Sequence, residues 1–184
     1  MGLFTVDDLD LVSALVLANW HGAVEEDWSV PAGTLEWSCL TTADHTIDCV
    51  FSYALFLGSR RLDEYPPFGE LHALPEAGPS DMVDGLRAVT TMLSATIRVA
   101  PPETRAVLRP KPNARAGGPD DFAARGTHEL ILHAHDIAAG LQQPLDPPAE
   151  VCERLYLATD GWFGPATEPP AGDPWAALLA RSGR

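Results

Sequence analysis

The sequence predicts an all-α protein that folds as one domain over residues 1–184. Apolar residues recur every three or four positions in several long segments, which is the spacing of one face of a helix. No segment keeps the strict two-residue alternation of a half-buried strand for long enough to matter. With 184 residues, 46% of them hydrophobic, the chain can bury one good core, and a second full domain is not expected.

Capping residues, prolines and glycines delimit the expected helices. Thr5 as N-cap, with Asp8 three residues later, starts a first helix that ends near Gly22. A second helix, at about 41–59, precedes a long loop at 62–79, where prolines and glycines break any regular element. A loop of that length in a compact domain is often part of a binding site. The later helices are expected at 80–99 with Ser80 as N-cap, at 120–142 after an irregular stretch, at 147–163 and at 174–180.

Charge and cysteine content exclude several classes of partner. The net charge of −14, from 26 acidic and 12 basic residues, argues against nucleic acid and against anionic membrane surfaces. The apolar stretch from Leu9 to Trp20 lacks a basic leader, so it is neither a signal peptide nor a membrane span. Cys39, Cys49 and Cys152 are odd in number and lack CxxC spacing, which suits a reducing compartment. A cytoplasmic location is therefore expected.

Three residues form a candidate metal site. Glu129 and His133 lie four apart on a predicted helix, so both side chains can reach one ion, and His45 can complete the site from a second helix. Three protein ligands leave one coordination position open for water or substrate, as in catalytic zinc sites. The alternative is that Glu129 and His133 are only a helix-surface pair, worth about 0.2–0.5 kcal/mol.

Two polar helix faces favour the metal site. An ionised glutamate among leucines and isoleucines is costly unless it is exposed, paired or bound to a metal. On the second helix, His45 shares a face with Cys49 and Ser52, and we interpret these two as pocket lining. Cys49 is also the main competitor as a ligand, because zinc accepts thiolate readily. The polar face of the fourth helix consists of Phe122, Gly126, Glu129, His133, Asp136 and Gly140.

The remaining polar residues are open to more than one interpretation. Asp136, one turn after His133, can orient that imidazole or can simply interact with solvent. The other histidines are expected to have no role in the site, and two of them, His128 and His135, are expected to point away from the face of Glu129 and His133.

Three segments resemble one family. The segment from Trp37 to His45 resembles the Trp-x7-His opening of the second helix in the DinB-like superfamily, in the branch of the mycothiol-dependent maleylpyruvate isomerases. The segment from Glu129 to Asp136 resembles that branch's Glu-x-x-x-His-x-x-Asp helix, and the segment from Trp175 to Arg184 resembles its usual carboxyl end. The three matches occur in the expected order and span nearly the whole chain.

The resemblance implies an up-and-down four-helix bundle with a long crossover connection and extra C-terminal helices. It implies a divalent metal, zinc or nickel, held by His45, Glu129 and His133, and a low-molecular-weight thiol cofactor such as mycothiol or bacillithiol. Eleven of the twelve basic residues are arginine, a skew typical of GC-rich bacterial genomes, which fits a mycothiol producer. The isomerase's substrate arginines have no motif match here, and helical location leaves Arg87, Arg98 and Arg125 as candidates.

The expected function is therefore metal-dependent activation of a thiol, whose thiolate attacks a small electrophile in a transfer or an isomerisation. One alternative keeps the metal and gives it a water, which makes a small-molecule hydrolase. Another is a non-catalytic bundle that binds or sequesters a small molecule. The oligomeric state is left open, with a homodimer as one possibility.

Overall fold

Four long helices form the body of the molecule. The computed structural model describes residues 4–159 and 171–184. Its long helices are α1 (Val6–Gly22), α2 (Cys39–Ser59), α3 (Pro79–Val99) and α4 (Pro119–Gly140). The all-α prediction is confirmed for the described residues, which are mostly helical.

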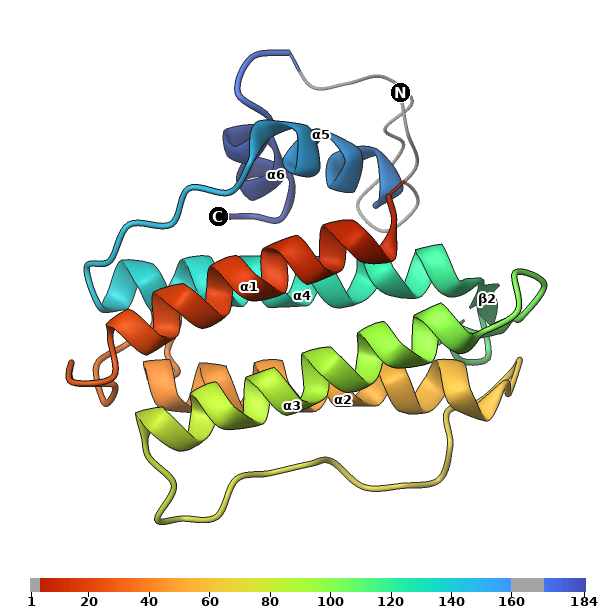
Figure 1. The fold of residues 1–184 in the computed structure, drawn as a ribbon, viewed down its shortest axis with the longest axis horizontal. Coiled ribbons are helices and arrows are strands. Elements are labelled where there is room, and N and C mark those ends of the chain that lie inside the picture. The colour runs from red at the N-terminus through yellow and green to blue at the C-terminus, as the bar shows by residue number, and fades with distance from the viewer. Residues whose placement is uncertain (1–3, 160–170) are drawn as a thin grey trace.

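The four helices form a bundle in which α1 and α2 each contact both α3 and α4. Figure 1 shows that α2 and α3 run in one direction and that α1 and α4 run in the other. Two consecutive parallel helices need a connection that returns along the whole bundle. The extended segment 60–78 makes this return, and we call it the strap. The expected long loop at 62–79 is thus a crossover connection.

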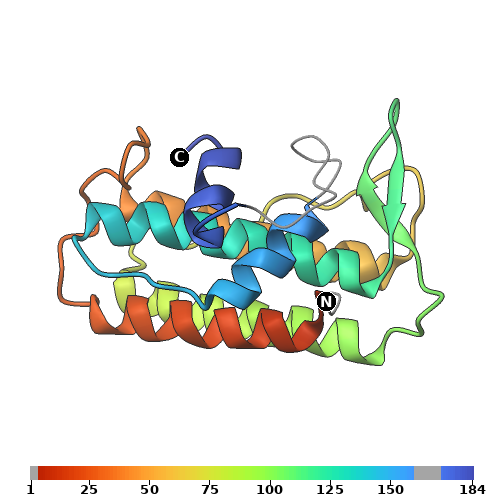
Figure 2. The same cartoon turned by 90° about the horizontal axis from the view of Figure 1, so that it is seen from above.

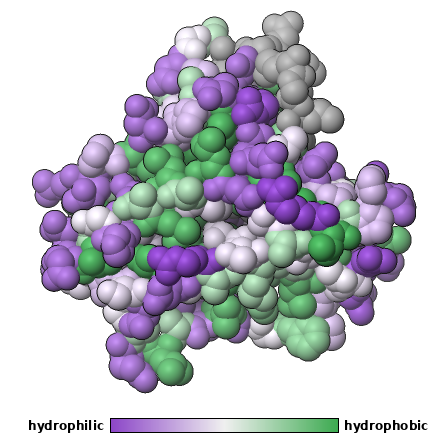
Figure 3. All heavy atoms as spheres, in the orientation of Figure 1, coloured by the Kyte–Doolittle hydropathy of each residue, from purple (hydrophilic) through white to green (hydrophobic). Residues whose placement is uncertain are grey.

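Two carboxylates of α2 hold the strap in place. The backbone N–H of Leu71 donates to Asp48 Oδ1 at 2.8 Å, and that of Ala73 donates to Asp44 Oδ1 at 2.7 Å. Two residues of extended chain advance about as far as one helical turn, so alternate strap amides meet carboxylates four residues apart. Several apolar side chains of the strap remain exposed, among them Leu62, Tyr65, Phe68, Leu71 and Leu74. Figure 3 shows hydrophobic surface along the lower edge of the molecule, where the strap runs in Figure 1.

Helix α2 begins earlier than expected, at Cys39 instead of near residue 41. Ser38 is the N-cap, and its hydroxyl accepts the Thr41 amide at 3.1 Å. The expectation failed because Ser38 lies in the polar run that precedes the periodic apolar residues, where the sequence offers several capping candidates.

Helix α3 also begins before the expected cap, because Pro79 takes its first position and Gly78 precedes it. The same arrangement starts α4, where Pro119 follows Gly118. In both helices an aspartate three residues after the glycine accepts the glycine N–H at 2.8 Å, which satisfies one of the unpaired amides of the helix end.

A β-hairpin occupies the connection between α3 and α4, where the sequence predicted only an irregular stretch. Strands β1 (Ala106–Arg109) and β2 (Arg115–Gly117) pair antiparallel, with Ala106 opposite Gly117 and Arg109 opposite Arg115. Strands of four and three residues are too short for alternation to be detected, which is why the sequence did not reveal them. The hairpin projects at one end of the bundle (Figure 2).

Two shorter helices, α5 (Ala149–Ala158) and α6 (Pro174–Arg181), pack against each other above α1 and α4 (Figure 1). The expected last helix at 174–180 is confirmed. The expected fifth helix is confirmed over 149–158, but it begins later than residue 147 and ends at Ala158, with Thr159 as its C-cap. Residues 160–163 of the expected helix lie outside the described residues. Leu155 and Leu178 are buried in this layer.

The core runs through the middle of the bundle and joins all four long helices. Its largest fully buried side chains include Trp20 from α1, Leu57 from α2, Leu93 from α3 and Phe122 from α4. Within the described part of the chain, no helix is both long and apolar enough to cross a membrane.

At Gly140, near its end, α4 lies very close to the backbone of the segment before α2. A Cβ at Gly140 would collide with the carbonyl oxygen of Pro31 and would lie 2.8 Å from the Cys39 sulfur. We therefore expect Gly140→Ala to lower the free energy of unfolding by about 1–3 kcal/mol, because a backbone atom cannot move aside as a side chain can. Urea denaturation followed by circular dichroism measures this change.

Gly22→Ala is the matched control, because no atom lies within 4 Å of a Cβ built there. A loss for Gly140→Ala no larger than that for Gly22→Ala would contradict the close approach of α4 to the segment before α2.

Candidate metal centre

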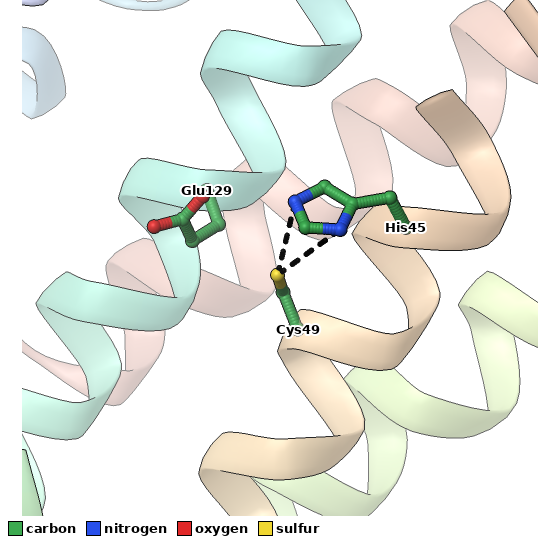
Figure 4. A group of neighbouring side chains, drawn as sticks. All are labelled: His45, Cys49 and Glu129. Atoms are coloured by element: carbon green, nitrogen blue, oxygen red, sulfur yellow. Dashed lines mark hydrogen bonds between the residues drawn. The ribbon is translucent and has the colours of Figure 1, made fainter. Parts of the chain in front are cut away.

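Helices α2 and α4 bring three metal-binding side chains together. Ligand atoms of His45, Cys49 and Glu129 all lie within 4.8 Å of one another, and this is the one such group among the described residues. Figure 4 shows the imidazole of His45 extending from α2 toward α4, with the Cys49 sulfur beside it and Glu129 across from them on α4. Two of the three predicted ligands, His45 and Glu129, belong to this group. The third, His133, does not, and Cys49, expected to line the pocket, is its third member.

Two pairs of candidate ligands face each other across the α2–α4 interface. Cys49 Sγ lies 3.4 Å from His45 Nε2 on α2. On α4, His133 Nε2 lies 3.6 Å from Glu129 Oε2. The two imidazole rings are 5.1 Å apart and nearly perpendicular. We call these four residues the α2–α4 cluster.

The Glu129 carboxylate is held from one side by two partners. Arg125 Nη2 lies 2.9 Å from Glu129 Oε1, and the Tyr53 hydroxyl donates to the same oxygen at 3.4 Å. Arg125 Nε in turn donates to the Tyr53 hydroxyl at 2.9 Å. Because these contacts converge on Oε1, the other oxygen, Oε2, is left facing His133.

This environment keeps Glu129 ionised. Burial by itself raises the pKa of the Glu129 carboxyl, but hydrogen bonding to His133 and the charge of Arg125 outweigh it and lower that pKa to about 2. An ionised, mostly buried carboxylate with one oxygen that Arg125 and Tyr53 do not bind is a suitable ligand for a cation.

Cys49 is a neutral thiol in the metal-free protein. Burial, followed by the nearby charges of Glu129 and Asp48, raises the pKa of Cys49 to about 12. A thiol with such a pKa is a poor nucleophile at neutral pH. A metal ion beside it would reverse this, because a coordinating thiol is deprotonated.

The surroundings shift the pKa values of the two cluster histidines in opposite directions. Burial and then the charge of His133 lower the pKa of His45. For His133, burial acts in the same direction, but the neighbouring carboxylates of Asp136 and Glu129 outweigh it and raise the pKa. The lowered pKa leaves His45 neutral near pH 7 and able to bind a cation, whereas the carboxylates beside His133 hold its proton more tightly, and a metal would have to displace that proton.

Asp136 contacts His133 from the side away from Glu129. Asp136 Oδ2 lies 3.3 Å from His133 Nδ1, and the same carboxylate binds the guanidinium of Arg184. Of the two interpretations open from the sequence, contact with His133 is the one that the structure supports, since Asp136 is buried.

Of the remaining candidate residues, one arginine reaches the site and the other two arginines lie on the surface. Ser52 is half-buried and makes no hydrogen bond to the cluster within the described part of the chain. Of the three candidate arginines, Arg125 reaches the site. Arg87 pairs with Asp84, and Arg98 pairs with Asp7 and Asp10, all on the surface.

Three histidines that were expected to have no role in the site have other surroundings. His135 packs edge-on against Trp175 of α6, and His72 of the strap binds Asp44 and Glu70. His128 is buried in the bundle, and burial lowers its pKa to about 4.

Sequence reasoning missed two residues of the site. Tyr53 lies four residues after Cys49 on the same face of α2, so the spacing that linked His45 to Cys49 would have found it. Arg184 gave no signal, because it lies 48 residues from its partner Asp136 and only the docking of the C-terminal segment brings the two together.

The cluster suits a zinc ion. Imidazole nitrogen, thiolate sulfur and carboxylate oxygen are the donors that zinc binds in proteins. Two donors on one tetrahedral zinc ion lie roughly 3.3–3.8 Å apart, given the usual bond lengths. The His45–Cys49 and Glu129–His133 separations both fall in that range.

A separate hollow lies on another side of α2, between the strap and α3. Its volume is about 510 Å³, and its lining includes Ile47, Leu74 and Met82 together with Asp44 and His72. None of the four residues of the α2–α4 cluster lines it, so it is distinct from the candidate metal centre.

Comparisons with protein-family models, with curated proteins and with solved structures found no match to this chain. The chemistry of the site is therefore argued from its own residues.

The lowered pKa of Glu129 predicts a pH-dependent contribution to stability. The folded-state pKa of about 2 lies below the ordinary value of 4.5, so the ionised carboxylate stabilises the metal-free fold above about pH 4.5, and this contribution is lost as the pH falls toward 2. We expect the free energy of unfolding of wild type to exceed that of Glu129→Gln by more at pH 7 than at pH 3.

Urea denaturation in the presence of a chelator measures both proteins, and the isosteric glutamine keeps the packing constant. An equal difference at the two pH values would contradict the ionised state of Glu129.

Proposed function

We propose that this chain is a divalent-metal-dependent enzyme that activates a low-molecular-weight thiol for attack on a small electrophile. The observation that carries the proposal is the α2–α4 cluster: two pairs of donors, one on each helix, each at the spacing of ligands on a single ion. The resemblance of the Trp37 to His45 and Glu129 to Asp136 segments to thiol-dependent isomerases supports the thiol, with mycothiol as the first candidate.

The residues that would hold the metal are His45, Glu129 and His133. Zinc is the first choice and nickel the second, because imidazole suits both ions and a neighbouring thiol favours zinc. When bound, the ion would lower the pKa of a coordinated thiol and so supply a thiolate nucleophile at neutral pH.

The chain's own residues prepare the site for this role. Arg125 and Tyr53 fix Glu129 through Oε1, which orients Oε2 toward the ion. Asp136 Oδ2 lies 3.3 Å from His133 Nδ1, and Nε2 of the same ring faces Glu129 Oε2. Preorganised donors need little rearrangement on binding, and this strengthens both affinity and catalysis.

Whether the Cys49 sulfur binds the metal distinguishes a catalytic site with an open position from a closed site. If its sulfur stays protonated, the metal has three protein ligands and one open position for the external thiol. If it binds, four protein donors surround the ion, and such a closed site is typical of structural zinc. The 3.4 Å contact between Cys49 and His45 is the specific observation that favours this second function, a metal-stabilised bundle without catalysis.

Metal content is the first test of the proposal. Untagged wild type, incubated with zinc and desalted, is expected to hold about one zinc ion per chain by elemental analysis, because three donors converge there. Glu129→Ala should lose that ion. The metal-loaded wild type should then consume model electrophiles such as maleate-type acids only when a thiol is added.

The surface variant Arg87→Ala, distant from the cluster, is the control and should keep the metal. A wild type that stays empty after zinc incubation would refute the metalloenzyme. Turnover of an ester or amide by metal-loaded protein without any thiol would instead support a hydrolase.

Cobalt substitution tests the role of Cys49. If Cys49 is a ligand, Co²⁺-loaded wild type shows a sulfur-to-metal charge-transfer band in the near ultraviolet, and Cys49→Ser loses that band. If Cys49 only lines the pocket, both proteins lack the band until an external thiol is added, because then the open position takes the thiolate.

His133→Ala is the companion variant, since it removes a nitrogen donor and leaves the sulfur in place. A charge-transfer band in the thiol-free wild type would contradict the three-ligand catalytic site and favour the closed one.

A further inference from the structure

We propose that Arg184 is a positioning residue for the candidate ligand His133 and acts on it through Asp136. The part of this inference that concerns metal binding rests on the proposed function. The part that concerns the orientation of the imidazole stands on the geometry of three side chains and does not need the metal.

The Arg184 guanidinium binds both oxygens of the Asp136 carboxylate. Its Nε donates to Oδ1 at 3.0 Å and to Oδ2 at 3.2 Å, and its Nη2 donates to Oδ2 at 2.7 Å. The Asp136 side chain is only 4% exposed. A planar guanidinium bound along a carboxylate fixes the carboxylate's rotation as well as its position.

Asp136 transmits this constraint to His133. Its Oδ2 lies 3.3 Å from His133 Nδ1. Both ring nitrogens face a carboxylate, Asp136 at 3.3 Å from Nδ1 and Glu129 at 3.6 Å from Nε2. The nearer carboxylate, which Arg184 holds in place, favours the tautomer with the proton on Nδ1 and the lone pair on Nε2. Nε2 is the atom that faces Glu129 Oε2 at 3.6 Å, and therefore the atom that would bind an ion in the α2–α4 cluster.

The packing of α6 brings Arg184 to this place. Leu178 of α6 is fully buried, and Trp175 packs against His135 of α4. Beyond the helix, Arg184 turns back toward α4, and the Arg184 backbone N–H donates to the Leu179 carbonyl oxygen at 3.0 Å. The C-terminal segment thereby supplies the third member of an arginine, aspartate and histidine series that ends at the candidate metal.

Zinc affinity of the full chain, measured by competition with a chromophoric chelator, tests the inference. We expect Arg184→Ala to raise the dissociation constant about tenfold or more, in the range typical of lost outer partners of a ligand. Arg184→Lys should restore part of the affinity, since an ammonium keeps the charge but cannot span both oxygens.

Arg181→Ala is the matched control, because Arg181 ends α6, three residues before Arg184, and binds the Tyr156 carbonyl oxygen and ring without touching Asp136. Its zinc affinity should stay within about twofold of wild type, well below the loss expected for an outer partner of a ligand. An equal loss in the two alanine variants would overturn the inference, since it would show that only the docking of α6 matters. So would an unchanged affinity in Arg184→Ala.

A second measurement does not depend on the metal. In chelator-treated protein, at an alkaline pH where the ¹⁵N shifts show both His133 and His72 to be neutral, long-range ¹H–¹⁵N spectra report the tautomer of each histidine. Wild-type His133 should carry its proton on Nδ1, and Arg184→Ala should show a mixture of tautomers, with His72 unchanged as an internal reference. If wild type binds no zinc but this change appears, the proposed function fails and the positioning role stands. An identical His133 tautomer in both proteins would refute the positioning role.

Discussion

The rest of the site depends on one buried carboxylate, that of Glu129. A charge at that depth between two helices is costly unless other groups compensate for it, and the surrounding residues do so from two directions. Arg125 and Tyr53 neutralise and hold one oxygen, and His133 faces the other. The same arrangement that makes the buried charge tolerable also leaves Oε2 unbound by Arg125 and Tyr53, and it keeps the carboxylate within 4.8 Å of the ligand atoms of His45 and Cys49. The contacts that compensate for the buried charge of Glu129 therefore also leave its carboxylate able to bind a cation.

The bundle provides the rigidity that such a site requires. Helix α2 carries His45 and Cys49 on the face toward α4, while on another face Asp44 and Asp48 bind the amides of the strap. The crossover connection thus holds α2 along the turn that carries the ligands. On the other side, α6 packs on α4 and brings Arg184 to Asp136. Both ligand-bearing helices are fixed by segments that lie outside the four-helix core, and this accounts for the ordered geometry of a polar cluster inside an apolar bundle.

Contacts between residues a few positions apart could be predicted from the sequence, whereas features that depend on tertiary contacts could not. The spacing of Glu129 and His133 is local, and it correctly indicated that both side chains share one face of α4. The same reasoning found the His45 and Cys49 face of α2. It did not detect the β1–β2 hairpin, whose strands are too short for a periodic signal, and it placed the starts of α2 and α3 late, because Ser38 and Gly78 were not recognised as the preceding caps. Boundaries depend on which of several capping residues is used, and tertiary contacts decide that choice.

By itself, the sequence determined the helical class, the number of long amphipathic segments, the long connection between the second and third helices, and the local pairing of polar residues on each helix face. These follow from periodicity and from proline and glycine positions, which act within a few residues. Only the tertiary structure decided that the ring of His45 packs against that of His133, that the Tyr53 hydroxyl reaches Glu129, and that Arg184 binds Asp136. These contacts join residues that are far apart in the sequence. They are set by how the helices pack, and no local pattern in the sequence encodes them.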